Sequence, residues 1–218
     1  KLPAAIDDET AAAALLKACT VEALVERCAR VEAGWPVLVH AAAGGVGLIL
    51  VQWLKAVGAT VIGTVSTAAK EQAARDAGAD HVIRYKDEDV AAQVREITDG
   101  QGVSVTFDGI GMATWATSLK ATARRGLIVS YGNAGGPVTG VNLGILAQHG
   151  SQFVTRPTLF DYYLDPGERA AGAARVFEML ESGAVAVTIG QRYPLRDAAR
   201  AHEDLEAGRT TGSTLLMP

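Results

Sequence analysis

An α/β fold built on a doubly wound, parallel, six-stranded sheet is what this 218-residue sequence predicts. Three observations support it: short Val- and Ile-rich runs alternate with helix-like runs, glycines close several of the helix-like runs, and the apolar runs lack strict polar alternation. The first two are typical of strand–helix repeats, and the third is typical of strands buried on both faces. Because such strands are joined by right-handed crossovers, we expect helices on both faces of the sheet.

Turn and cap signals place the elements along the chain. Asp7 or Asp8 can cap a first helix that runs to about Cys28, with Thr20 as a candidate break. The strands expected next are residues 34–41, 60–66, 80–85, 103–111, 127–134 and 151–159. Helices are expected between them at 46–57, 68–78, 87–102 and 114–126. From residue 165 the rhythm changes to a helix at 166–183, an extended piece at 184–195, a helix at 196–208 and a strand at 210–218.

Composition excludes several classes of protein. The formal net charge is −4 and no basic tract is present, which argues against a nucleic-acid partner. The two cysteines, Cys19 and Cys28, form no C-x-x-C pair, which argues against a structural zinc site and a disulfide scaffold. The apolar run from Val37 to Leu54 is broken by His40 and three glycines, so we expect no membrane span. With no visible signal peptide, a reducing cytoplasm is the expected location.

A glycine-rich turn follows the first expected strand and opens the next helix. The stretch from Ala42 to Gly47 matches the dinucleotide-binding pattern G-x-G-x-x-G, with Ala42 in place of the first glycine. Gly44 would let a phosphate approach the backbone, and Gly47 would let the helix pack closely on the strand. No G-K-[ST] follows, so a P-loop is excluded. The alternative is a tight turn that binds nothing.

The end of the second expected strand bears on the choice of dinucleotide. NAD sites usually carry an Asp or Glu there to bind the ribose hydroxyls, but no acidic residue lies between Gly63 and Lys70. Ser66 could donate a hydrogen bond to a 2′-phosphate, and Lys70 could neutralise its charge. These residues favour NADP(H). The alternative is that Lys70 is a solvated helix residue. Tyr85, just past the third strand, could contact the adenosine.

Other polar residues offer weaker candidates. Asp108 ends the fourth strand and could be a catalytic acid, although a turn or cap role is more common. Asn133 ends the fifth strand, at the edge where such sheets bind ligands, and could lie near a nicotinamide or simply support its turn. His40 is expected inside a strand, and His81 and His202 at the surface. No G-x-S-x-G elbow suggests a hydrolase, and no residue pair has metal-ligand spacing.

Five segments together resemble a known family. "LVHAAAGGVGL", "GATVIGTVS", "AGADHVI", "RRGLIVSYGNAGGPVTGVNLGIL" and "TRPTL" are similar to the NADPH-dependent quinone oxidoreductases. These are zinc-free, zeta-crystallin-like members of the medium-chain dehydrogenase/reductase superfamily. The resemblance runs through nearly the whole chain to "TTGSTLLMP", and the run from Arg124 to Leu146 is specific to the group.

The resemblance implies a two-domain enzyme. An NADP-binding Rossmann domain would span residues 19–160, after a connection or remnant of the catalytic domain at 1–18. Residues 161–218 would be a C-terminal remnant that returns to a GroES-like catalytic domain. Because that domain would precede this sequence, the chain is expected to represent the cofactor half of a reductase. Exposed strand edges pair subunits in the family, so a homodimer through Ser151 to Leu159 is expected.

The resemblance also implies a set of cofactor contacts. They comprise the glycine turn, a 2′-phosphate pair, an adenosine contact and two loops beside the nicotinamide. Together the expected cofactor-binding residues are Gly44, Gly45, Val46, Gly47, Ser66, Lys70, Tyr85, Ile110, Asn133, Ala134, Gly135, Pro157 and Thr158. Zinc-dependent relatives carry a cysteine four residues before a Thr-Val pair, where this sequence has Leu16. Two departures from the family are "ACTVEAL", usually more aromatic, and Arg84, where many relatives have Asn.

The activity implied is hydride transfer from C4 of NADPH to a quinone or related activated enone, without a metal or a covalent intermediate. No catalytic residue or general acid is assigned in this chain. One alternative is a reductase of the same superfamily that acts on enoyl thioesters. The other is a non-catalytic module that binds or senses NADPH.

Overall fold

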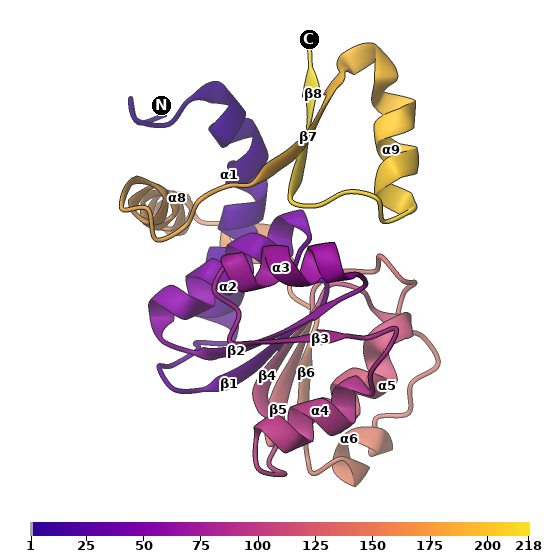
Figure 1. The fold of residues 1–218 in the computed structure, drawn as a ribbon. Coiled ribbons are helices and arrows are strands. Elements are labelled where there is room, and N and C mark those ends of the chain that lie inside the picture. The colour runs from indigo at the N-terminus through magenta and orange to yellow at the C-terminus, as the bar shows by residue number, and fades with distance from the viewer. Residues whose placement is uncertain (1) are drawn as a thin grey trace.

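A computed structural model describes residues 2–218 and contains the predicted sheet (Figure 1). Its six parallel strands lie in the order β3-β2-β1-β4-β5-β6, which is the doubly wound dinucleotide-binding order with its reversal between β1 and β4. The strands are β1 (Pro36–Val39), β2 (Thr60–Val65), β3 (His81–Arg84), β4 (Val103–Asp108), β5 (Thr122–Ser130) and β6 (Phe153–Thr155). The predicted fold class is confirmed.

Helices cover both faces of this sheet (Figure 1). The helices up to the end of β6 are α1 (Asp8–Glu22), the π-helix η1 (Ala23–Cys28), α2 (Gly45–Val57), α3 (Ala68–Asp76), α4 (Val90–Ile97), α5 (Met112–Ala121) and α6 (Gly144–Gln148). Asp7 caps α1 by accepting a hydrogen bond from the Thr10 amide, and Asp89 caps α4 in the same way. Gly58 ends α2 in the left-handed conformation, as the turn signal predicted.

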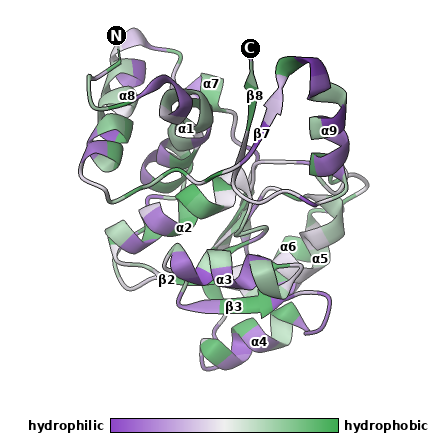
Figure 2. Cartoon of the chain, turned by 45° about the horizontal axis from the view of Figure 1, so that its top comes forward, coloured by the Kyte–Doolittle hydropathy of each residue, from purple (hydrophilic) through white to green (hydrophobic). Residues whose placement is uncertain are grey.

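Successive residues of β1 feed two separate cores. Val37 and Val39 pack with α1 and α2 on one face, whereas Leu38 packs with Val90 and Val94 of α4 on the other. Burial on both faces explains why the strands are continuously apolar. Figure 2 shows the hydrophobic character of α2, which lies between the sheet and α1. Within residues 2–218, no helix combines the length and the apolarity needed to cross a membrane.

The remaining chain forms a group of elements beyond the carboxyl edge of the sheet (Figure 1). It contains α7 (Leu159–Tyr162), α8 (Pro166–Glu181), β7 (Ile189–Pro194), the 3₁₀ helix η2 (Leu195–Asp197), α9 (Ala198–Glu206) and β8 (Ser213–Met217). Val176 and Met179 of α8 join the same core as β1 and α2. The strands β7 and β8 pair in parallel as a separate two-stranded sheet.

Several predicted boundaries were wrong. The first helix changes to a π-helix after Glu22. The helix expected at 114–126 ends at Ala121, and β5 starts at Thr122 rather than residue 127. Thr122 is held by long-range bonds, because its hydroxyl lies 2.7 Å from that of Thr106 and its carbonyl accepts from Gln152. The expected strand 151–159 shortens to β6, and Leu159 begins the short helix α7. His40 lies just past β1 rather than inside it.

Candidate functional site

The glycine turn brings α2 against the end of β1. A Cβ on Gly47 would lie 2.2 Å from the Ala41 carbonyl oxygen and 2.8 Å from the Ala42 carbonyl carbon, so only glycine allows this close packing. A Cβ on Gly44 would have one tight neighbour, the Ala41 carbonyl oxygen at 3.3 Å. The backbone of this turn therefore requires glycine at residue 47 much more strictly than at residue 44.

The turn presents unpaired backbone donors at the start of α2. No side chain caps this helix. The Gly44–Gly212 bridge directs the Gly45 amide to the Gly212 carbonyl, whereas the amides of Val46 and Gly47 have no hydrogen-bond acceptor within the described part of the chain. The positive end of the helix dipole lies at the same place. No acidic residue is present in the first turn of α2. This combination of free amides and helix dipole suits an anionic group such as a pyrophosphate.

The C-terminal part of the chain lies against this turn. Gly212 pairs with Gly44 as an isolated parallel bridge, and its amide donates to the Ala43 carbonyl at 3.1 Å. A Cβ on Gly45 would lie 3.1 Å from the Gly212 carbonyl oxygen and 2.8 Å from Cε of Lys17. Residues from both ends of the chain therefore narrow the space beside the turn.

Beyond β2, Ser66 and Lys70 lie at the start of α3. Thr67 caps this helix by accepting from the Lys70 amide at 3.3 Å. The Lys70 ammonium donates to the Gly208 carbonyl at 2.8 Å. Burial lowers the pKa of Lys70, and the nearby charge of Lys86 lowers it further. Lys70 is therefore a half-buried, bonded cation rather than a freely solvated one.

Tyr85 and Ile110 line one cavity of about 360 Å³, called here the Tyr85 cavity. Its other lining residues are His40, Ala41, Thr64, Glu88, Asp89, Val90, Ala113, Thr114 and Thr117. These residues lie at or beyond the carboxyl ends of β1, β2, β3 and β4, so the cavity opens at the edge where doubly wound sheets bind ligands. Arg84 is turned into ion pairs with Glu71 and Asp87 rather than into this cavity's lining.

A series of buried hydrogen bonds begins at His40 and Thr64, which line the Tyr85 cavity. His40, 2% exposed, has Nδ1 at 3.0 Å from the Thr64 hydroxyl and Nε2 at 3.1 Å from the Ser118 hydroxyl. Ser118 donates to the Asp108 carboxylate at 2.7 Å. Because Ser118 has only one proton to give, it must accept from Nε2–H of His40, and Thr64 then donates to Nδ1. Burial lowers the pKa of His40 despite the opposing charge of Asp108, so the ring is neutral.

Asp108 serves the turn before α5. Its Oδ1 accepts the amides of Ile110 and Gly111, each at 2.9 Å, and it also accepts the Thr114 hydroxyl at 2.8 Å. Together with Ser118, these donors occupy a side chain that is 1% exposed. The turn-and-cap interpretation therefore fits Asp108, and a role as catalytic acid does not.

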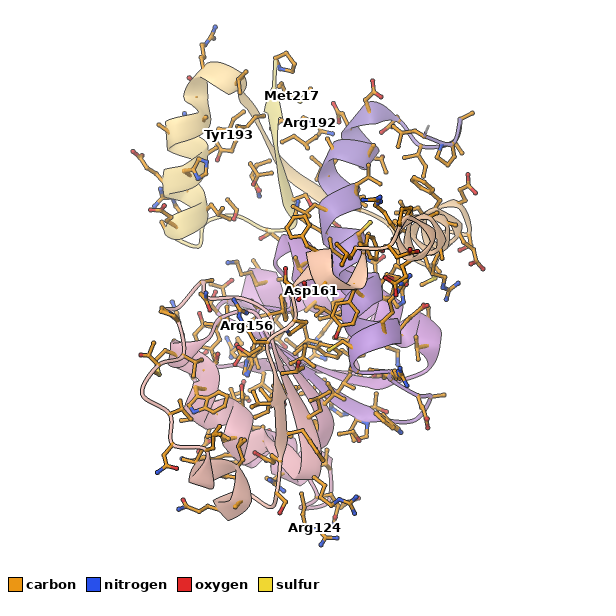
Figure 3. All side chains as sticks on the ribbon, turned by 180° about the vertical axis from the view of Figure 1, so that it is seen from behind. Arg124, Arg156, Asp161, Arg192, Tyr193 and Met217 are labelled. Carbon is orange, nitrogen blue, oxygen red and sulfur yellow. The ribbon has the colours of Figure 1, made fainter. Side chains whose placement is uncertain are left out.

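The nicotinamide-side candidates divide between two further cavities. Asn133 lines the Asn133 cavity, of about 510 Å³, with Trp115, Ser130, Pro137, Val138, Thr139, Gly140, Val141, Leu143, Leu146, Val154 and Arg156. Pro157 and Thr158 line the Thr158 cavity, of about 330 Å³, with Thr20, Ala23, Leu24, Tyr131, Arg156, Leu159, Phe160 and Tyr162. Arg156 belongs to both. Figure 3 shows it at the end of the sheet nearest the C-terminal elements, whereas Arg124 lies at the opposite end.

Backbone contacts join the Asn133 loop to the end of β4. The Gly135 amide donates to the Ile110 carbonyl at 2.7 Å, and the Ala134 amide donates to Gly109 at 3.3 Å. A Cβ on Gly135 would lie 2.7 Å from Cγ2 of Ile110. The loop that carries Asn133 is thus tied to Ile110, a lining residue of the Tyr85 cavity.

Three residues at this edge were not singled out from the sequence. Arg156 was part of a quoted motif, "TRPTL", and its position next to Pro157 was the available signal. Lys86 directly follows Tyr85 and adds a second positive charge near Lys70. Gly212 offered no local signal, because its partner Gly44 lies far away in the sequence.

Comparisons with known proteins agree on the family. A family model described as zinc-binding dehydrogenase matches residues 45–158. A quinone oxidoreductase of Pseudomonas aeruginosa is 51% identical over 217 residues, which cover 100% of this chain and 67% of that protein. This chain belongs to the quinone oxidoreductase family. The crystal structure of Escherichia coli quinone oxidoreductase complexed with NADPH is 50% identical and superposes with a TM-score of 0.97, covering 100% of this chain and 67% of that one.

Not every relative is named as a quinone oxidoreductase. A 2-haloacrylate reductase of Burkholderia is 41% identical over 217 residues, which cover 98% of this chain and 64% of that protein. The shared feature of the two names is that both proteins are oxidoreductases, and this member of the quinone oxidoreductase family is an enzyme of the same kind.

The description of the family model raises the question of zinc. Among residues 2–218, no three His, Cys, Asp or Glu side chains come together as a metal site requires. Cys19 and Cys28 are both partly buried free thiols, and burial raises the pKa of Cys19. Residues 2–218 therefore bring together no set of side chains that fits a zinc site.

Proposed function

We propose that this chain binds NADPH along the carboxyl edge of its sheet and that the enzyme transfers hydride to a quinone or related activated enone without zinc. The observation that carries this proposal is the pairing of an uncapped α2 N-terminus with a cation at the end of β2. The amides of Val46 and Gly47, which have no acceptor within the described residues, suit a pyrophosphate. Lys70 suits a 2′-phosphate, since no acidic side chain lies between Gly63 and Lys70 to repel it.

The three cavities suit an extended dinucleotide. In this proposal the Tyr85 cavity, with Tyr85 and Ile110, takes the adenosine end. Ser66 and Lys70 hold the 2′-phosphate, and the turn from Gly44 to Gly47 holds the pyrophosphate. The nicotinamide end lies among two segments from the carboxyl ends of β5 and β6, with contacts from Asn133, Ala134, Gly135, Pro157 and Thr158.

The chain's residues would bind and orient, and the cofactor would supply the hydride from C4 of its nicotinamide. Orientation lowers the barrier when the reacting atoms are held at near-attack distance. The apolar side chains of Leu24, Leu159 and Phe160 line the Thr158 cavity and would exclude water from the nicotinamide end. Exclusion of water protects the hydride from competing reactions.

The direct test is calorimetric binding of NADPH and NADH to the protein, beside the Lys70→Ala variant. We expect NADPH to bind more tightly than NADH and the variant to lose that preference, because a charge-assisted bond to phosphate is worth about 1.5–3 kcal/mol. Lys120→Ala is the matched control, since Lys120 is an exposed residue of α5 outside the three cavities. Equal affinity of the wild-type protein for the two dinucleotides would contradict the proposal.

The substrate class is testable in the same protein. The relative named 2-haloacrylate reductase favours an activated, conjugated acceptor as much as a quinone. The turnover of 1,4-benzoquinone, of a simple conjugated enone and of an enoyl thioester should therefore be compared at the same NADPH concentration. Turnover of the enoyl thioester alone would favour the thioester reductase, and NADPH binding without turnover of any acceptor would favour a sensing module.

A further inference from the structure

Within residues 2–218, the hydroxyl group of Tyr131 has no hydrogen-bond partner. Tyr131 follows β5 directly, and its amide donates to the Asp108 carbonyl at 2.9 Å. Its ring packs against Gly109, since a Cβ there would be 2.9 Å from the Tyr131 ring and from its Oη. No hydrogen bond of the Tyr131 hydroxyl is found within the described residues. Tyr131 is half-buried rather than fully buried, so its hydroxyl is open to a bound molecule.

The hydroxyl remains a donor at all working pH values. Burial raises the pKa of Tyr131 well above that of a solvated phenol, and the charge of Asp108 raises it further. A neutral phenol can donate one hydrogen bond to an oxygen atom, and loss of its proton inside this site is disfavoured. Tyr131 is therefore suited to polarise a carbonyl oxygen rather than to give up a proton.

The Thr158 cavity, which Tyr131 lines, has the composition of a site for a flat, oxygen-bearing ring. No Asp or Glu is among its lining residues, whereas Arg156 contributes a cation. Of the other hydroxyl groups in the lining, that of Thr20 donates to the Leu16 carbonyl at 2.8 Å, whereas the Thr158 side chain makes no cap bond to α7. The apolar walls are Ala23, Leu24, Pro157, Leu159 and Phe160. The volume of about 330 Å³ lies within the range of small-molecule sites.

We infer that the Tyr131 hydroxyl donates a hydrogen bond to a ring-borne carbonyl oxygen in the Thr158 cavity, which makes it a binding and specificity residue of the hydride-transfer site. This inference rests on the proposed function. The carbonyl belongs either to the nicotinamide carboxamide of the cofactor or to the quinone or enone substrate. In the second case, the bond strengthens as negative charge develops on that oxygen during hydride transfer.

Tyr131→Phe removes the hydroxyl alone and leaves the ring packed on Gly109. Tyr193→Phe is the matched control, because the Tyr193 hydroxyl on β7 donates to Asp204 and lies outside the cavity. The measurements are the Kd values of NADPH and of 2′,5′-ADP, which lacks the nicotinamide, and kcat/KM for 1,4-benzoquinone. Thermal unfolding of both variants confirms that they fold.

Two results support the inference and separate the two carbonyls. A loss of about 3- to 10-fold in NADPH affinity, with 2′,5′-ADP binding unchanged, identifies the carboxamide. A similar loss in kcat/KM for 1,4-benzoquinone, with NADPH affinity unchanged, identifies the substrate. In protein labelled with 3-fluorotyrosine, the fluorine resonance that Tyr131→Phe deletes should shift on addition of NADPH plus benzoquinone and stay fixed with 2′,5′-ADP.

The failures are distinguishable. The inference is overturned, and the proposed function stands, if the wild-type protein binds NADPH and three results hold. Tyr131→Phe has the same NADPH affinity and the same kcat/KM as the wild-type protein, and the Tyr131 fluorine resonance of the labelled wild-type protein does not shift. If the wild-type protein binds neither NADPH nor 2′,5′-ADP, the proposed function is overturned, and the role of Tyr131 is overturned with it.

Discussion

At the scale of single residues, neighbours determine the chemical state of side chains at the site. The donors around Asp108 fix the direction of the Ser118 hydroxyl, and Ser118 in turn fixes the tautomer of His40. None of this could be predicted from the sequence, where His40 is one of four scattered histidines. The four hydrogen-bonded residues, Asp108, Ser118, Thr64 and His40, lie on β4, α5, β2 and the turn after β1. Only the assembled sheet brings them together.

The buried His40 predicts a loss of stability in mild acid. Its pKa is lowered in the folded protein from the ordinary value of 6.5. As the pH falls below about 6.5, the unfolded chain takes up a proton that the folded chain does not, so the free energy of unfolding decreases until the folded-state pKa is reached. His40 contributes a loss of at most about 1.4 kcal/mol between pH 7.5 and pH 5.5, because the unfolded-state pKa of 6.5 sets this limit.

Urea denaturation at these two pH values checks this expectation. The difference between them should shrink in His40→Gln, which has no titrating ring, and should persist in His81→Gln, since His81 is exposed on β3. An unchanged pH difference in His40→Gln would show that the buried ring is not responsible.

At the scale of elements, the glycine turn tests how tightly α2 is packed on β1. Gly47→Ala places a methyl group 2.2 Å from the Ala41 carbonyl oxygen, so α2 must move outward, with an expected loss of about 2–3 kcal/mol. Gly44→Ala meets the same oxygen at 3.3 Å from an extended backbone, with φ of −77°, and should lose less than about 1 kcal/mol. The midpoints of urea denaturation measure both. Equal losses would mean that the turn adapts freely.

Elements were predictable where their signals are local. The cap Asp7 and the glycine at residue 58 lie beside the helices that they delimit, so the start of α1 and the end of α2 were predicted correctly. The helix expected at 87–102 shortens to Val90–Ile97, after its cap Asp89. The start of β5 was missed because Thr122 is held by Thr106 and Gln152, which are distant in sequence. Local propensity extended α5 past Ala121, and tertiary hydrogen bonds ended it there.

At the scale of the whole molecule, the sheet ends at an exposed edge strand. Phe153 of β6 is 58% exposed and Val154 is 39% exposed. An apolar edge strand pairs readily with another chain, and we propose that β6 of two copies forms the centre of a homodimer. The residues of the binding site at this edge were predictable as separate motifs, but their division among three cavities depends on long-range packing.

Sedimentation equilibrium tests the proposed pairing. We expect a mass of twice 22.6 kDa for the wild-type protein and half of that for Phe153→Asp, because a charge on the edge strand opposes pairing. Leu205→Asp, at a residue of α9 that is 56% exposed, should remain dimeric. A wild-type protein that stays monomeric at high concentration would rule out the dimer.

The bridge between Gly44 and Gly212 has a consequence for biosynthesis. Chains fold progressively as they leave the ribosome, so β1 and α2 emerge long before the residue that lies against their turn. A nascent chain can build the strand and the helix while the Gly212 side of the turn is still open. The turn is completed only after residue 212 has been translated, when all six strands of the parallel sheet have already been made.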